Sequence, residues 1–101
     1  MTYKSIILPQ AKNEIREAAR YYNDQKTDLG LRFLKEVKSR VASISKQPEI
    51  YQIRYRTVRM ALLKKFPYSI HYCIDDENKH IVVLALFHQA QDPTKWDREE
   101  K

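Results

Sequence analysis

Residues 56–88 read RTVRMALLKKFPYSIHYCIDDENKHIVVLALFH, and this stretch decides the fold of the chain. β-branched and aromatic residues dominate it, and one acidic-polar break interrupts it at 75–79. Such residues suit the pleated, half-buried surface of a sheet. We therefore predict three consecutive antiparallel strands: one beginning at Val58, one over 68–74 and one over 81–87.

The residues before this stretch predict one strand and two helices. Residues 3–8 alternate as a short strand, and Pro9 suits the first turn of a helix that runs to about residue 22 or 23. A second amphipathic helix follows a polar link and stops near Lys46, ahead of Pro48. The order strand, helix, helix, then three strands predicts an α+β fold.

In this β-α-α-β-β-β fold, a helical hairpin packs on one face of a small, mainly antiparallel twisted sheet. The other sheet face, or its rim, is then available for function. Residues 51–55 leave two alternatives open, an extension of the following strand or an irregular basic-aromatic lead-in. Gly30 also leaves two, a close approach of the helices or a simply tolerated glycine.

Length and composition limit the classes of protein to which the chain can belong. At 101 residues the chain is one domain, 1–101, with 89–101 as a charged C-terminal tail. Its longest apolar run, 81–87, is far shorter than the roughly 20 residues of a membrane-spanning helix, and we see no secretory signal. Cys73 is the only cysteine, which favours a cytoplasmic location. A single glycine excludes phosphate-cradling loops, and we expect neither a cofactor nor a metal.

The net charge of +6 is concentrated in one segment. Residues 50–74 contain no Asp or Glu. The segment's cations are Arg54, Arg56, Arg59, Lys64 and Lys65. A concentrated positive field favours nucleic acid, an acidic protein or another anionic surface as the partner.

Two segments, FPYSIHY at 66–72 and LALFHQAQDPTKW at 84–96, resemble the RelE/ParE superfamily of toxins from bacterial type II toxin–antitoxin systems. The Phe-Pro-Tyr and His-x-x-x-x-Pro-x-x-Trp forms are closer to the ParE-like branch. One departure is Gln91, which stands where many ParE-like members have arginine and removes a cation from the expected working surface.

The resemblance implies a toxin that is neutralised by a cognate antitoxin with an acidic-amphipathic tail. In the ParE-like branch it implies inhibition of DNA gyrase by binding, without catalysis. The RelE-like branch instead implies ribosome-dependent cleavage of messenger RNA. A third possibility is a degenerate toxin that acts mainly in a repressor complex, reaching operator DNA through the antitoxin.

Candidate site residues follow for each possibility. A nuclease needs a base, an acid and cations for the phosphate, for which we expect His88, His71 and Arg59. The residues expected to bind the target or nucleic acid are Arg54, Arg56, Arg59, Lys64, Lys65 and Gln91. Those expected to bind the antitoxin are Arg54, Arg56, Tyr68 and Tyr72.

Each candidate also has a structural interpretation. Lys64 and Lys65 are typical of a solvated strand edge, and both Tyr68 and Tyr72 are typical of a core or its rim. The register of the last hairpin bears on the histidines: if Asp75 pairs with His80, His71 and His88 share a sheet face, and a slip of one residue separates them.

Overall fold

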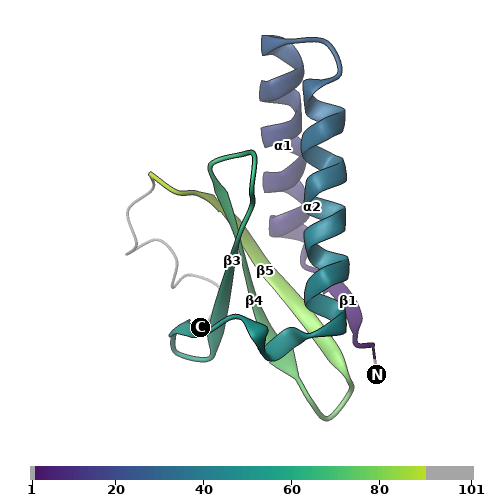
Figure 1. Cartoon of the computed structure of the whole chain (residues 1–101), viewed down its shortest axis with the longest axis vertical. Helices are drawn as coiled ribbons and strands as arrows, with labels where there is room; N and C mark the ends of the chain where they lie inside the picture. Colours follow the sequence, from purple (N-terminus) through teal and green to yellow (C-terminus); the bar gives the residue numbers. More distant parts are fainter. Residues whose placement is uncertain (1, 91–101) are drawn as a thin grey trace.

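The computed structural model describes residues 2–90 and has two helices packed against a five-stranded sheet (Figure 1). The elements in chain order are β1 (Lys4–Ile7), α1 (Pro9–Gln25), α2 (Leu29–Lys46), the 3-10 turn η1 (Pro48–Ile50), β2 (Ile53–Tyr55), β3 (Val58–Leu62), β4 (Tyr68–Asp75) and β5 (His80–His88). The predicted α+β architecture, with a helical hairpin on one sheet face, is confirmed.

The sheet has the strand order β1-β5-β4-β3-β2. β1 pairs in parallel with β5, and the remaining pairs are antiparallel, so the sheet is mixed but mainly antiparallel. Residues 53–55 form a short strand of their own, which settles the open alternative for that segment and adds a strand to the predicted three. β1 and β2 are the two sheet edges.

The two helices approach closely where α2 begins. Gly30 is buried and donates its N–H to Asn23 Oδ1 at 2.9 Å. A Cβ at this position would lie 2.3 Å from the carbonyl oxygen of Ala19, so any side chain here would force the backbone of the two helices to shift. Gly30 is therefore the residue that permits close packing of the hairpin.

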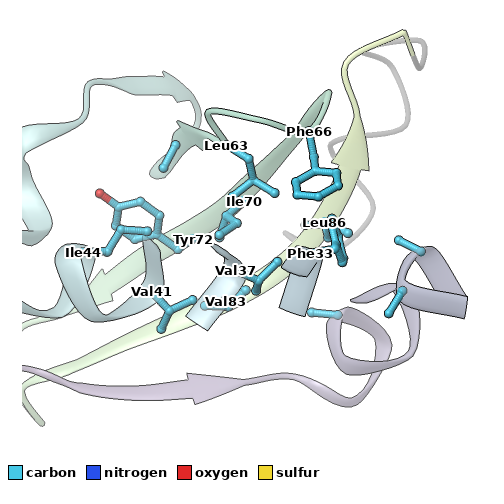
Figure 2. Packing of buried hydrophobic residues seen from close by; sticks show 14 of the residues in the cluster. Phe33, Val37, Val41, Ile44, Leu63, Phe66, Ile70, Tyr72, Val83 and Leu86 are labelled. Atoms are coloured by element: carbon cyan, nitrogen blue, oxygen red, sulfur yellow. The ribbon is translucent and has the colours of Figure 1, made fainter. Parts of the chain in front are cut away.

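The main core lies between the two helices and the sheet. Figure 2 shows Phe33, Val37 and Val41 of α2 with Ile70 and Leu86 of the sheet. Aromatic contacts strengthen one end of this core; the centroids of Phe33 and Phe66, for example, lie 5.2 Å apart. The apolar face of the amphipathic helix α2 thus packs against the sheet, as predicted.

The opposite sheet face is buried as well. Its second apolar cluster is formed by Val58, Leu84, Ala85 and Phe87, each with at most 6% of its surface exposed. Of the two places predicted for function, the opposite sheet face or its rim, this part of the face is therefore closed. The rim of the sheet and the surfaces of the helices remain as candidates.

Candidate functional site

Arg59 and Tyr72 face each other across β3 and β4, on the helix side of the sheet. Arg59 Nη1 donates to the Tyr51 carbonyl oxygen at 2.6 Å, and the Tyr72 hydroxyl donates to the Pro48 carbonyl oxygen. The two side chains therefore fasten η1 and the residue that follows it to the sheet. Tyr72 is completely buried, and this burial raises its pKa to about 12. The prediction that Tyr72 contacts an antitoxin is wrong because it offers no surface.

His71 lies on the other sheet face and is also completely buried. Its Nδ1 is 3.0 Å from the Tyr55 hydroxyl, its Nε2 is 2.8 Å from Ser69 Oγ, and its ring packs edge-on against Phe87. Burial, with a smaller contribution from the positive charge of Arg54, lowers the pKa of His71 to about 4. The ring is therefore neutral near pH 7, and its polar contacts with Tyr55 and Ser69 lie beside the second apolar cluster.

His88 lies on the helix side, near the end of β5. Its ring packs edge-on against Tyr68 with centroids 5.1 Å apart, and its Nδ1 accepts a hydrogen bond from the Ala90 N–H at 3.0 Å. Tyr68 is half-buried, and burial raises its pKa. Both residues therefore pack at the rim of the main core.

The two histidines do not share a face, although Asp75 pairs with His80 as the expectation required. The register shifts between Tyr72, which pairs with Val83, and His71, which pairs with Ala85. Leu84 is the extra residue of this β-bulge, and it reverses the alternation of side chains beyond it. The expected catalytic set of His71, His88 and Arg59 is therefore not assembled.

The five cations of the basic segment are divided among three places. Arg54 is exposed on β2, and Arg56 lies in the β2–β3 turn with a left-handed φ of 48°. Lys64 and Lys65 lie in the β3–β4 loop, at the other end of β3, and Arg59 is tied to backbone carbonyls between them. In Figure 1, the β2–β3 turn and the β3–β4 loop lie at opposite ends of β3. The predicted single cationic surface is thus wrong, and Gln91 lies outside the described residues.

A hollow at one sheet edge combines apolar and cationic residues. Ile50 and Leu62 are 62% and 49% exposed, and they line a hollow of about 430 Å³. We call this the β2–β3 edge surface; it comprises Arg40, Ile50, Tyr51, Gln52, Arg54, Met60 and Leu62. Arg40 Nη1 donates to the Tyr51 hydroxyl at 2.8 Å, which holds α2 against this edge.

A second hollow lies where β1 meets the two helices. This apolar groove has a volume of about 640 Å³. Its lining comprises Ser5, Ile7, Lys12, Ile15, Arg16, Ala19, Leu34, Val37, Lys38, Val41 and Ala42. Three of these residues are cations and none is acidic, so the groove offers apolar contacts beside positive charge. Leu34 lies on the predicted second helix, but a groove between three elements cannot be predicted from one helix alone.

The comparisons with known proteins agree with this fold. The family described as ParE toxin of type II toxin-antitoxin system, parDE, matches residues 6–93. The chain belongs to the ParE toxin family. No curated protein matches the chain in sequence.

Solved structures of toxins are similar to this ParE-family chain. The chromosomal ParDE system from P. aeruginosa matches with a TM-score of 0.75 and 13% identity, covering 86% of this chain and 96% of that one. The intact E. coli RelBE toxin–antitoxin complex matches with a TM-score of 0.68 and 18% identity, covering 89% and 99%. The isolated E. coli RelE toxin matches with a TM-score of 0.68 and 16% identity, covering 97% and 96%. These likenesses establish the fold that ParE and RelE toxins share.

Two further features concern the described part of the ParE-family chain. Within residues 2–90, no helix has the length and apolar character that crossing a membrane requires. Over the same residues, His, Cys, Asp and Glu side chains nowhere gather in threes in a way that could hold a metal ion.

Proposed function

We propose that this ParE-family toxin acts in the cytoplasm by binding to DNA gyrase and inhibiting it, and that a cognate antitoxin neutralises it. The observation that carries this proposal is the composition of the β2–β3 edge surface. Exposed Ile50 and Leu62 beside Arg54 provide the apolar anchors and the arginine that protein–protein interfaces favour. Gyrase as the target rests on the resemblance to the ParE-like branch.

The positions of the histidines support inhibition by binding over cleavage of RNA. A general acid or base must reach the reacting atoms and titrate near the working pH. His71 is buried with a pKa of about 4, and His88 lies on the opposite face beside Tyr68. Arg59 is engaged with the Tyr51 carbonyl, so it does not extend toward either histidine to hold a phosphate.

The apolar groove supports an antitoxin with an acidic amphipathic segment. Its apolar lining includes Ile15, Leu34 and Val41, while Lys12 and Lys38 add positive charge. A helix that places apolar side chains into such a groove, with carboxylates along its edges, complements both features. The groove is built from α1, α2 and β1, and so it is separate from the β2–β3 edge surface.

Purified toxin tests the proposal in two parallel assays: supercoiling by gyrase, and cleavage of ribosome-bound message. We expect inhibition in the first and intact message in the second. Leu62→Glu should weaken inhibition by roughly 10-fold or more, since it places a charge in an apolar hot spot. Leu31→Glu is the matched control because Leu31 is similarly exposed, at 51%, on another part of the surface.

Three results would contradict the proposal. Site-specific cuts in translated message that His88→Ala abolishes would identify a nuclease. Inhibition of gyrase that is equally sensitive to Leu62→Glu and Leu31→Glu would reject the β2–β3 edge surface. Neither activity, with no growth defect when the toxin is expressed without antitoxin, would identify a degenerate toxin of a repressor complex.

A further inference from the structure

The outer side of α2 and the β3–β4 loop enclose a groove that shares only Arg40 with the β2–β3 edge surface of the proposed function. It has a volume of about 680 Å³, and we call it the cationic groove. Its charged lining comprises Arg32, Lys35, Glu36, Arg40, Lys64 and Lys65. Five cations therefore face a single carboxylate.

That carboxylate positions the loop. Glu36 accepts hydrogen bonds from the backbone N–H groups of Lys64 and Lys65, with distances of 3.1 and 3.3 Å to the latter. These bonds fasten the loop to α2 and bring its two lysines beside Arg32 and Lys35. The cations of a loop and a helix, far apart in sequence, are thereby held along one groove.

The cationic side chains are available for a ligand. Arg32, Lys35, Lys64 and Lys65 are exposed. Over residues 2–90, the structure gives none of these four side chains an ion pair or a hydrogen bond. In the described part of the chain, none of these four charges is therefore paired with a carboxylate.

We infer that the cationic groove binds the phosphate backbone of nucleic acid. Ser39 and Ser43 also line it and add hydroxyl groups, which commonly donate to phosphate oxygens. Its aromatic residue, Phe66, is only 9% exposed, so the groove lacks the prominent apolar anchors of the β2–β3 edge surface. This polar lining favours a phosphate backbone over an acidic protein, whose interface would need such anchors.

The site also lies on the opposite side of α2 from the apolar groove. Of the residues of α2, Leu34, Lys38 and Val41 line the apolar groove, whereas Arg32, Lys35 and Ser39 line the cationic groove. With about 3.6 residues per turn, these two sets project to opposite sides of the helix. A toxin whose apolar groove holds the antitoxin therefore keeps the cationic groove free, a consequence that rests on the proposed function. The toxin then contributes its own contacts when the complex binds operator DNA.

Titration of the purified full-length toxin with labelled duplex DNA, duplex RNA and single-stranded RNA of equal length tests the site. The comparison of the three probes identifies which backbone the groove prefers. We expect salt-dependent binding, and Arg32→Gln with Lys35→Gln should reduce affinity roughly tenfold and lower the salt slope by about 2. Arg20→Gln with Lys26→Gln is the matched control because it removes the same charges from an exposed region outside the groove.

Equal losses in the two double variants would overturn the proposal, since net charge alone would then explain binding. Absence of salt-dependent binding to all three probes would also overturn it. Tighter binding of polyglutamate than of any nucleic acid, lost in Arg32→Gln with Lys35→Gln, would identify an acidic protein as the ligand instead.

Repeating the titration with the toxin–antitoxin complex separates the two proposals. A salt slope that falls when the complex carries the Arg32→Gln, Lys35→Gln toxin supports a free groove in the complex. If the two substitutions lower the salt slope of the free toxin but not that of the complex, the nucleic-acid site is retained. The same result would reject the proposal that the antitoxin leaves this site free.

Discussion

At the scale of single residues, His71 illustrates how burial changes what a side chain does. The sequence offers it as a proton carrier, because histidine ordinarily titrates near neutral pH. In the fold it is enclosed by Tyr55, Ser69 and Phe87, and its pKa falls to about 4. The residue therefore affects stability in acid, and it does not act as a surface catalyst.

We predict that His71 makes the toxin less stable as the pH falls from about 6.5 to 4. In this range the unfolded chain binds a proton that the folded chain excludes, so acid favours unfolding. A pKa lowered from 6.5 to about 4 corresponds to roughly 3 kcal/mol of unfolding free energy. Urea unfolding of the wild type and of His71→Gln at pH 7, 5.5 and 4 measures this loss. Parallel pH profiles for the two proteins would show that the prediction is wrong.

Arg59 donates a hydrogen bond to the Tyr51 carbonyl oxygen, so we expect its replacement to affect stability. Replacing it by Ala removes a charge-assisted hydrogen bond to the Tyr51 carbonyl, which contributes roughly 1.5–3 kcal/mol. We expect Arg59→Ala to lower the free energy of unfolding by about that amount, as measured in urea. Arg20→Ala, on the exposed side of α1, should have little effect. Full stability of Arg59→Ala together with lost inhibition would instead indicate a direct contact with the target.

At the scale of elements, the sequence predicts those helices and strands whose apolar residues recur with a clear periodicity. The apolar spacing of Phe33, Val37 and Val41 predicts α2, and the alternation over 68–74 predicts β4. β2 is too short for a clear pattern, and the bulge at Leu84 follows from the match of two strands, which neither strand reveals alone. For the same reason, the sequence could indicate His71 and His88 as candidate functional residues, but it could not show on which sheet face each of them lies.

The helical hairpin gives a direct test of close packing. Gly30→Ala places a methyl group against the Ala19 carbonyl oxygen, and overpacking of this kind typically costs 1–3 kcal/mol. We expect a net loss of about 1–2 kcal/mol, because alanine's higher helix propensity offsets up to about 1 kcal/mol. Ser39→Ala, on the exposed side of α2, provides the control in thermal unfolding. A rise in melting temperature for Gly30→Ala would mean that α1 can shift away from the added methyl group at little cost in free energy.

At the scale of the whole molecule, the candidate surfaces are distributed around the helical hairpin and the sheet rim. The apolar groove and the cationic groove lie on opposite sides of α2, and the β2–β3 edge surface lies at the sheet edge. Lys64 and Lys65 adjoin Arg32 and Lys35 only because a loop folds back onto a helix. The sequence indicates these lysines as candidates but not their helical neighbours, because Arg32 and Lys35 lie more than twenty-five residues earlier in the chain.

This division predicts that neutralisation and inhibition can be separated by single substitutions. Leu34 is 40% exposed in the apolar groove, whereas Leu62 is 49% exposed on the β2–β3 edge surface. Leu34→Glu should weaken antitoxin binding roughly 10-fold or more while gyrase inhibition persists, because a carboxylate there repels an acidic segment and disrupts apolar contact. Leu62→Glu should do the reverse. Calorimetric titration with the antitoxin and a supercoiling assay measure both effects; loss of both functions in each variant would mean that one shared surface serves antitoxin and target.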